Sequence, residues 1–221
     1  YNPYDLERLA RLGTEAPALA VDGDYAVSVG RLVPNKNFAL LIRAWHQAQP
    51  AEKLVILGEG PEHESLQRLI EALGLQQRVI LGGFQHNPYA IMQRARYAVF
   101  SSLAEGFPNA MAEAMALALP VIATDCDSGP AEILQDEIRV YPDKALRAKF
   151  GILVAVNDQA SMVEALRMMQ NEETVAHYRQ MSRERIRDFG MERSVNRYLN
   201  ALAGLSDAGD PAMASAQNAL K

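Results

Sequence analysis

Short apolar segments alternate with helical ones through most of this chain, and this alternation limits the possible folds more than any other feature. The segments typical of strands are rich in β-branched and other apolar residues and lie at 24–30, 53–58, 78–83, 97–102, 120–125 and 151–156. Helical periodicity covers the segments between them, at 37–48, 62–73, 88–95, 109–118 and 158–169. Such alternation predicts βαβ crossovers and a parallel sheet, and strands that are apolar throughout are typical of a sheet covered on both faces. We therefore predict an α/β, Rossmann-like fold with helices on both faces of the sheet.

The pattern changes after residue 171 to charged, amphipathic helix. Two helices are expected there, at 172–190 and 191–205, with Gly190 as the break between them. The residues that follow have the composition of a tail. We therefore expect the sheet domain to be followed by closing helices at its C-terminal end.

Composition excludes several classes of function. The chain of 221 residues carries a net charge of −5 and no run of Lys and Arg, which argues against a nucleic-acid-binding groove. No apolar run reaches the ~18 residues that a membrane span needs. The single cysteine, Cys126, excludes an internal disulfide and a cysteine-based zinc site, and indicates a reducing compartment. We interpret Cys126 as a small packing residue. Metal-binding spacing is absent among the histidines, which are His46, His63, His86 and His177.

Ligands of parallel α/β sheets bind at the carboxyl ends of the strands, so the loops that follow the strands are the candidate binding segments. The first of them, "GRLVPNKN", contains Gly30, which permits a close backbone turn, and the two cations Arg31 and Lys36. A basic pair in this position could hold a diphosphate, with Arg as a bidentate donor and Lys as a point charge. Two solvated surface cations are the alternative, and the spacing alone does not decide between them.

The loops after the second and third strands also contain glycines, but they are less specific evidence of a binding site. "GEGPEH" resembles a dinucleotide-binding fingerprint, but the third glycine is missing and Pro61 occupies the turn. "GGFQHNPY" is either a simple glycine turn or a loop whose backbone contacts a base. Neither loop is specific evidence by itself.

The loop after the fourth strand leads into an apolar helix that carries carboxylates. In "EGFPNAMAEAMALALP", Glu105 lies in the loop, Pro108 suits a first helical position, and Asn109 shares a helix face with Glu113. Glu113 is the only charged residue between 109 and 119, in a helix whose composition predicts burial on all sides. Since an unpaired buried carboxylate is costly, Glu113 must pair internally or meet a polar ligand.

Carboxylates and a helix N-terminus suit different parts of one ligand. Carboxylates repel phosphate, but an ionised carboxylate accepts hydrogen bonds from pairs of hydroxyls, such as those of ribose or a hexose. The helix N-terminus between them offers free N–H groups and a positive dipole to a phosphate. This short stretch therefore contains groups suited to a sugar, a phosphate and a ribose.

Four motifs in this order resemble the donor-binding domain of retaining GT-B glycosyltransferases of family 4. They are "GRLVPNK", "LVILGEGP", "EGFPNAMAEAMALALPVIATD" and "SGPAEIL", and the resemblance covers roughly residues 22–200. It implies that Glu105 contacts the donor sugar, that Glu113 contacts the ribose hydroxyls, and that Arg31 and Lys36 bind the diphosphate. Glu105, Arg31 and Lys36 are the implied catalytic residues. The implied donor-binding residues are Gly30, Arg31, Lys36, Gly58, Glu59, Phe84, Glu105, Gly106, Phe107, Pro108, Asn109, Ala110 and Glu113.

The same resemblance implies a domain division and partners. Residues 1–21 would be an interdomain linker and lead-in, 22–204 the donor-binding Rossmann-like domain with its closing helices, and 205–221 a tail. The expected function is transfer of a hexosyl group, with retention, from a nucleoside diphosphate sugar to a glycan or lipid-linked acceptor. A UDP-sugar is the expected donor, and no metal or other cofactor is expected. The acceptor-binding N-terminal domain would be missing; the protein would be cytoplasmic, with peripheral contact to the inner membrane face through that domain.

Two segments depart from the family pattern. Residues 135–150 are charged and lack glycine, and we interpret them as a surface insertion. "DCD" at 125–127 imitates the D-x-D metal motif of another glycosyltransferase fold, but the resemblance places it in a fold that needs no metal.

Other functions remain open at this point. A glycosidase also uses paired carboxylates, but has no need of Arg31, Lys36 or a phosphate-binding helix N-terminus. A nucleotide-dependent dehydrogenase would need the glycine fingerprint that "GEGPEH" lacks. The third alternative is an isolated nucleotide-sugar-binding module without activity of its own.

Overall fold

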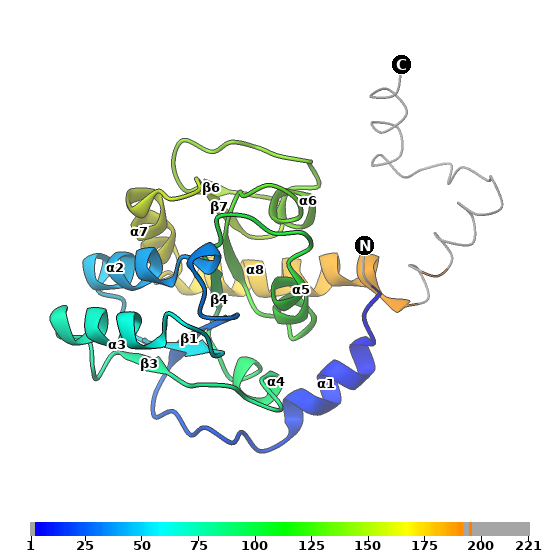
Figure 1. The fold of residues 1–221 in the computed structure, drawn as a ribbon. Coiled ribbons are helices and arrows are strands. Elements are labelled where there is room, and N and C mark those ends of the chain that lie inside the picture. The colour runs from blue at the N-terminus through cyan, green and yellow to red at the C-terminus, as the bar shows by residue number, and fades with distance from the viewer. Residues whose placement is uncertain (1–2, 192–194, 196–221) are drawn as a thin grey trace.

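The computed structural model describes residues 3–191 and residue 195 and contains a seven-stranded sheet with the order β3-β2-β1-β4-β5-β7-β6 (Figure 1). All neighbouring strands are parallel except β6, which pairs antiparallel with β7 at the edge. The strands are β1 (Tyr25–Val29), β2 (Lys53–Leu57), β3 (Val79–Leu81), β4 (Ala98–Phe100), β5 (Val121–Thr124), β6 (Leu146–Arg147) and β7 (Ile152–Val154). The predicted α/β, Rossmann-like fold is confirmed.

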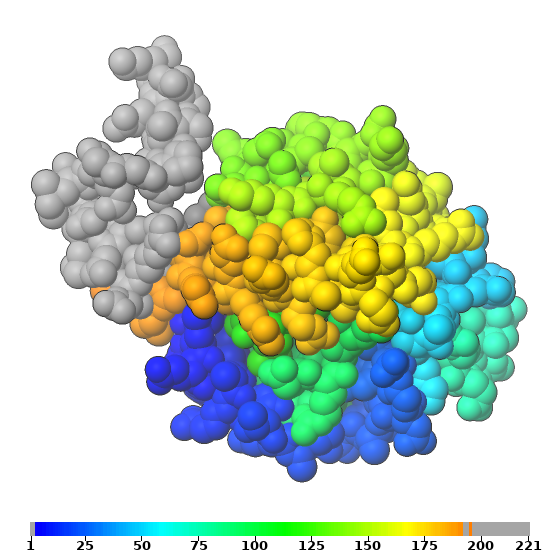
Figure 2. All heavy atoms as spheres, turned by 180° about the vertical axis from the view of Figure 1, so that it is seen from behind, coloured from blue at the N-terminus to red at the C-terminus, as the bar shows by residue number. Residues whose placement is uncertain are grey.

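Helices cover both faces of this sheet. Their bounds are α1 (Leu6–Thr14), α2 (Phe38–Ala48), α3 (His63–Ala72), α4 (Tyr89–Met92), α5 (Asn109–Ala116), α6 (Pro130–Leu134), α7 (Gln159–Met168) and α8 (Glu172–Arg185), with the 3-10 segments η1 (Pro34–Lys36) and η2 (Ile186–Phe189). Helices α2, α3 and α7 lie on one side of the sheet, and α1, α4, α5 and α6 on the other (Figure 1). Seen from behind, α8 forms a band across the molecule between the N-terminal segment and the segment around residues 130–150 (Figure 2).

The core divides into two clusters because successive strand residues point to opposite faces of the sheet. In β2, Leu54 and Ile56 belong to the cluster under α2, α3 and α7, whereas Val55 and Leu57 belong to the cluster under α4 and α5. All four side chains are buried. A sheet buried on both faces explains why its strands show no polar alternation.

The structure differs from the sequence prediction at the N-terminal end of the chain. No helix was predicted in residues 1–21, but α1 lies there, begins at the cap Asp5 and packs against α4 and α5. Tyr4 pairs with the other end of the domain: its N–H donates to the carbonyl of Phe189, and its carbonyl accepts from Met191. The predicted helical segment 88–95 is also shorter, since α4 covers only Tyr89–Met92.

The C-terminal prediction is confirmed in part. The helical pattern of residues 172–190 corresponds to α8 and η2, which end at Phe189, so Gly190 does mark a break. Almost all of the second predicted helix, 191–205, and the predicted tail, 205–221, lie outside the described residues. No helix in the described part of the chain is long and apolar enough to cross a membrane.

The interpretation of residues 135–150 as a surface insertion is wrong for part of the segment. Leu146 and Arg147 form the edge strand β6, and Ala145, Ala148 and Phe150 are buried. Hydrogen bonds hold the segment to the domain, since Asp125 accepts from the N–H groups of Val140 and Tyr141 and the carbonyl of Leu134 accepts from the N–H of Phe150. A charged, glycine-free segment can thus still bury its few apolar side chains. It extends the sheet by one antiparallel strand.

Candidate functional site

The sheet order places a topological switch point between β1 and β4. The strands that follow β1 in sequence extend the sheet on one side of it, and β4 and β5 extend it on the other. Ligands of doubly wound sheets bind in the crevice beyond the carboxyl ends of the two strands at such a point. The loops concerned are residues 30–37 after β1 and residues 101–108 after β4.

Hydrogen bonds hold these two loops against each other. The N–H of Leu103 donates to the carbonyl of Asn35 at 2.8 Å, and Asn35 Nδ2 donates to the carbonyl of Ala104 at 2.7 Å. Ser101 Oγ also donates to the carbonyl of Lys36, at 2.8 Å. The sequence separation of these partners is large, so only the sheet order brings them together.

The loops after β1 and β2 approach each other so closely that glycine is required. Gly58 has φ +135°, and a Cβ at this position would lie 2.0 Å from the carbonyl oxygen of Gly30. A Cβ on Gly60 would lie 2.4 Å from the carbonyl oxygen of Leu32. The glycines of "GEGPEH" therefore serve backbone packing between two loops, and the carbonyl of Glu59 accepts from the N–H of Leu32.

Glu105 and Lys36 form an ion pair at the switch point. Lys36 Nζ donates to Glu105 Oε1 at 2.5 Å, and Ser102 Oγ donates to the same oxygen at 2.6 Å. The side chains of Lys36 and Glu105 are 26% and 13% exposed, respectively. Gly30 lies beside the aliphatic stem of Lys36, and a Cβ there would be in ordinary van der Waals contact with it at 3.4 Å. The structure thus brings together Gly30, Lys36 and Glu105, three of the predicted site residues.

The loop after β5 supports the Glu105 loop from the other side. Thr124 Oγ1 donates to the carbonyl of Ser102 at 2.5 Å, and the N–H of Glu105 donates to the carbonyl of Asp127 at 3.4 Å. Gly129 has φ +101°, and a Cβ there would lie 2.3 Å from Cδ of Pro108. The glycine in "SGPAEIL" therefore allows the start of α6 to pack on the start of α5.

Helix α5 is not buried on all sides, contrary to the expectation from its composition. Asn109 is exposed and Glu113 is half-buried, while Met111, Ala112, Ala114 and Met115 are buried. Tyr89 donates to Glu113 Oε1 at 3.1 Å, and Tyr4 donates to Asn109 Oδ1 at 2.7 Å. One face of the helix is thus polar and ends at the helix N-terminus.

Burial raises the pKa of Glu113, and the Tyr89 hydrogen bond opposes this shift. The pKa of Tyr89 is raised to about 12 by burial, by the Glu113 charge and by the hydrogen bond to it. The tyrosine is therefore a protonated donor at neutral pH, facing a carboxylate that is harder to ionise than an exposed one.

Three other predicted site residues are exposed and take no part in the ion pair. Arg31 and Glu59 are exposed side chains in the loops after β1 and β2. Phe84, in the loop after β3, is 61% exposed and contacts the His86 ring at 5.1 Å between centroids. The remaining predicted residues lie where β4 leads into α5; Gly106 is exposed, Phe107 and Ala110 are half-buried, and Pro108 is buried.

Three side chains of the site were not predicted. Ser102 precedes Glu105 by three residues, so its position next to a loop carboxylate was a signal that could have been used. Tyr4 and Tyr89 come from segments far from α5 in sequence. Nothing in their local sequence indicates that they meet Asn109 and Glu113.

The carboxylates of "DCD" are structural. Asp125 is buried, and its Oδ2 accepts the backbone N–H groups of Val140 and Tyr141 at 3.0 and 2.6 Å. Asp127 forms an ion pair with Arg139. Within residues 3–191 and 195, no group of His, Cys, Asp and Glu is arranged to hold a metal ion. Burial, followed by the Glu105 charge, raises the pKa of the Cys126 thiol to about 11, which suits a packing residue.

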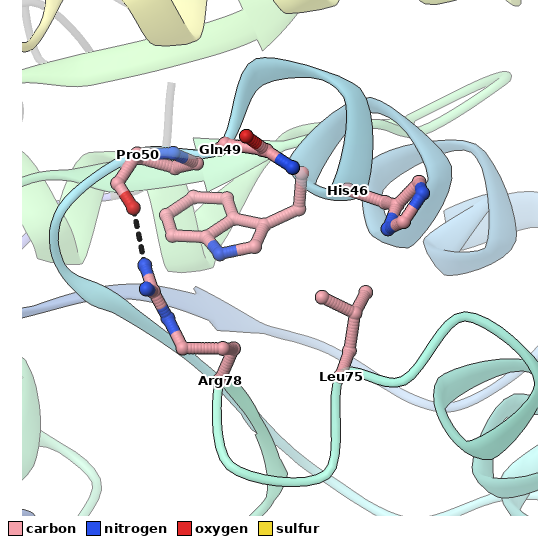
Figure 3. A pocket seen from close by; sticks show the side chains of 6 residues that line it. His46, Gln49, Pro50, Leu75 and Arg78 are labelled. Atoms are coloured by element: carbon pink, nitrogen blue, oxygen red, sulfur yellow. Dashed lines mark hydrogen bonds between the residues drawn. The ribbon is translucent and has the colours of Figure 1, made fainter.

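Two hollows lie at the opposite, amino-end edge of the sheet. One, of about 380 Å³, is lined by residues that precede β2 and β3, among them Pro50 and Arg78, whose guanidinium donates to the Pro50 carbonyl (Figure 3). The other, of about 340 Å³, lies beside Arg96 and Arg179. Neither hollow includes a predicted site residue, and the ion pair at the switch point lies at the other edge.

The sequence matches the family described as Glycosyl transferases group 1 over residues 14–188. This match covers most of the chain, so the chain belongs to that family, and its fold and family place it among the GT-B glycosyltransferases. It is 35% identical over 205 residues to the Campylobacter jejuni N-acetylgalactosamine-N,N'-diacetylbacillosaminyl-diphospho-undecaprenol 4-alpha-N-acetylgalactosaminyltransferase. That alignment covers 92% of this chain and 53% of the relative, so the chain spans about half of that protein's length.

Solved structures agree with the family assignment. The structure of a mutant of Staphylococcus aureus TarM in complex with Fondaparinux, alpha-GlcNAc-glycerol and UDP superposes with a TM-score of 0.70 at 26% identity, over 84% of this chain and 36% of TarM. Anabaena HepE in complex with UDP superposes with a TM-score of 0.75 at 21% identity, over 93% of this chain and 57% of HepE. The second likeness shows the fold.

Proposed function

We propose that this chain is the donor-binding half of a retaining GT-B glycosyltransferase of family 4, with a nucleoside diphosphate sugar as donor. The observation that carries the proposal is the Lys36–Glu105 pair at the switch point, beside the N-terminus of α5. A cation, a carboxylate and the positive end of the α5 helix dipole at one strand edge match the diphosphate, the sugar hydroxyls and the phosphate oxygens of such a donor. No cofactor is part of the proposal.

Each part of the donor has a proposed partner. Glu105, which accepts from Lys36 and Ser102 through Oε1, has Oε2 for the hydroxyls of the transferred sugar. Lys36 carries three N–H donors, of which one is directed to Glu105, so the others can reach a phosphate. Arg31 is exposed in the same loop and can add a bidentate contact. Glu113, on the polar face of α5, is the proposed acceptor for the ribose hydroxyls.

The proposed role of these groups in the reaction is to stabilise the leaving diphosphate. As the bond between sugar and phosphate breaks, negative charge grows on the diphosphate while an oxocarbenium-like centre forms on the sugar. Lys36, which is held by Glu105, and the N-terminus of α5 are fixed positive groups that stabilise this charge without reorganisation. Arg31 adds a further positive charge from the same loop. Glu105 then holds the sugar in place through its hydroxyls.

The donor base and the acceptor are inferred from the relatives. The TarM and HepE structures are named as complexes with UDP, and the Campylobacter relative is named for an undecaprenol-linked acceptor. We therefore propose a UDP-sugar as donor and a glycan or lipid-linked acceptor, bound with a further acceptor domain. The domain division of the proposal is 1–21 as linker and lead-in, 22–204 as donor domain and 205–221 as tail. Its proposed location is the cytoplasm, at the inner membrane face.

Titration calorimetry with UDP tests the proposal. Arg31→Ala and Lys36→Ala should each weaken UDP binding roughly tenfold or more, because a charge-assisted hydrogen bond contributes about 1.5–3 kcal/mol. Arg68→Ala is the matched control, since Arg68 is an exposed cation on α3 whose partner is Glu64 on the same helix. Unchanged affinity in both site variants would make Arg31 and Lys36 surface cations.

An isolated nucleotide-sugar-binding module without activity of its own is the second candidate. Release of UDP from a UDP-sugar in the presence of a lipid-linked acceptor separates the two. A chain that binds the donor without any turnover would be a binding module.

A further inference from the structure

Glu113 is held by a neutral donor. Tyr89, the first residue of α4, donates to Glu113 Oε1 at 3.1 Å, and no Lys or Arg of the described residues forms an ion pair with this carboxylate. Glu105 differs, because its Oε1 accepts from the ammonium of Lys36. The two carboxylates of the site are thus fixed by partners of different charge.

A neutral partner leaves Glu113 with its negative charge and most of its acceptor capacity. A carboxylate offers about four lone-pair sites, and the Tyr89 hydroxyl uses one of them on Oε1. The other oxygen, Oε2, has no hydrogen-bond partner among the described side chains. A diol needs such a group, because two adjacent hydroxyls can both donate to a charged carboxylate.

We propose that Tyr89 is a positioning residue that fixes the Glu113 carboxylate for a ribose diol and so makes the site select a ribonucleotide over a 2'-deoxyribonucleotide. This inference rests on the proposed function, in which Glu113 accepts the ribose hydroxyls. It assigns a specificity role to a residue that lies twenty-four positions before Glu113 in the chain.

The surroundings of Tyr89 support a fixed orientation. Its ring is half-buried against the core cluster that also contains Ile91 and Met92 of α4. A second tyrosine contacts the same face of α5, since Tyr4 donates to Asn109, one turn before Glu113. A carboxylate that is already oriented loses less conformational entropy when the ligand binds.

The hydroxyl remains protonated over the pH range in which the carboxylate is charged. Burial and the negative charge of Glu113 raise the pKa of Tyr89 to about 12. Tyr89 therefore donates, and the carboxylate accepts, at neutral pH. The hydrogen bond does not reverse direction when a ribose hydroxyl arrives.

The test compares each nucleoside diphosphate with its 2'-deoxy form. Calorimetry first finds which of UDP, ADP and GDP binds the wild-type chain, and then measures that ligand against its 2'-deoxy counterpart. We expect the wild type to prefer the ribose form about tenfold or more, the size of a lost charge-assisted hydrogen bond. Tyr89→Phe should reduce this preference to roughly threefold or less, mainly by weakening the ribose form. Glu113→Gln should reduce it at least as much.

Tyr25→Phe is the matched control. Tyr25 also contacts α4, where its buried hydroxyl donates to the carbonyl of Ile91 at 2.6 Å and not to Glu113. This variant should keep the wild-type preference for ribose even if it lowers the melting temperature. A ratio of two affinities is insensitive to general destabilisation, which would affect both ligands alike.

The outcomes separate the inference from the proposed function. A wild-type preference that Glu113→Gln abolishes and Tyr89→Phe leaves intact would overturn the role of Tyr89 alone. A wild type that does not distinguish ribose from deoxyribose would overturn the ribose role of Glu113 and, with it, that of Tyr89. Loss of preference in both Tyr89→Phe and Tyr25→Phe would assign the effect to the position of α4 and also overturn the inference.

Discussion

Glu105 and Glu113 lie eight positions apart in the chain, and the protein holds their charges in two different ways. Glu105 is in the loop after β4, 13% exposed, with an ammonium and a hydroxyl on one oxygen. Glu113 is half-buried on α5, with one phenol hydroxyl as its hydrogen-bond donor. The Lys36 ammonium neutralises the first carboxylate, whereas no Lys or Arg in the described part of the chain pairs with the second.

This difference separates stability from binding at the two positions. A buried ion pair is costly to break, because removal of one member leaves the other charge without compensation. A half-buried carboxylate without a cation already carries a desolvation cost, which a hydroxylated ligand can offset. We therefore expect Glu105 to contribute to the stability of the fold and to binding of the sugar. Glu113 should contribute to binding of the nucleotide and lower the stability of the fold.

The largest expected effect comes from breaking the ion pair. Lys36→Met keeps an aliphatic stem against Gly30 and removes the ammonium, which leaves Glu105 buried with only Ser102 as donor. Breaking a fully buried pair costs about 3–5 kcal/mol, and the partial exposure of this pair lowers the expected loss to about 2 kcal/mol. Urea denaturation measures it.

A second substitution checks the cause of that loss. Glu105→Gln in the Lys36→Met background removes the uncompensated charge, so the double variant should recover part of the lost stability. If Lys36→Met is as stable as the wild type, the pair contributes nothing measurable to folding. Glu105 and Glu113 would then not differ in their contribution to stability.

The next effect concerns ligands. Glu105→Gln should weaken binding of the nucleotide-sugar several-fold to about tenfold and leave the bare nucleoside diphosphate nearly unchanged, because the diphosphate carries no hexose. Glu113→Gln should weaken both ligands alike, since both contain the ribose. Calorimetry with UDP and a panel of UDP-sugars measures this. Equal losses for both ligands in Glu105→Gln would contradict the assignment of that residue to the sugar.

The architecture could be predicted from the sequence because it depends on periodicities that are local in the chain. Apolar strands separated by helical segments predicted the sheet, and the strand ends predicted which loops form the candidate site. The proximity of Lys36 and Glu105 could be predicted by the same reasoning, since both residues lie in loops after strands that a doubly wound sheet places side by side. Their contact follows from topology.

Contacts between distant segments could not be predicted in the same way. Tyr89 and Tyr4 belong to short segments whose local sequence shows no sign of a partner on α5. Residues 135–150 show neither strand alternation nor glycine turns, because β6 contains only Leu146 and Arg147, and the backbone of Val140 and Tyr141 is held by Asp125. Such features depend on packing partners, which a single sequence does not name.

The smallest expected effect is a gain of stability on removing the charge of Glu113. Burial raises the pKa of this carboxyl in the folded state, so the folded protein holds its proton more tightly than the unfolded chain does. By linkage, ionisation of Glu113 costs stability at neutral pH, and the cost disappears as the pH falls through the folded pKa toward the ordinary range of a glutamate. Glu113→Gln, which still accepts from Tyr89, should therefore be more stable at pH 7 by about 0.5 kcal/mol, the lower end for single stabilising substitutions.

Thermal denaturation of the wild type and of Glu113→Gln from pH 7 to pH 4 should show the difference in stability shrinking toward zero. Glu105→Gln should show no gain at pH 7, because it removes the charged partner of Lys36. A Glu113→Gln variant that is strongly destabilised at pH 7 would mean that the charge itself stabilises the fold, and Glu113 would then resemble Glu105.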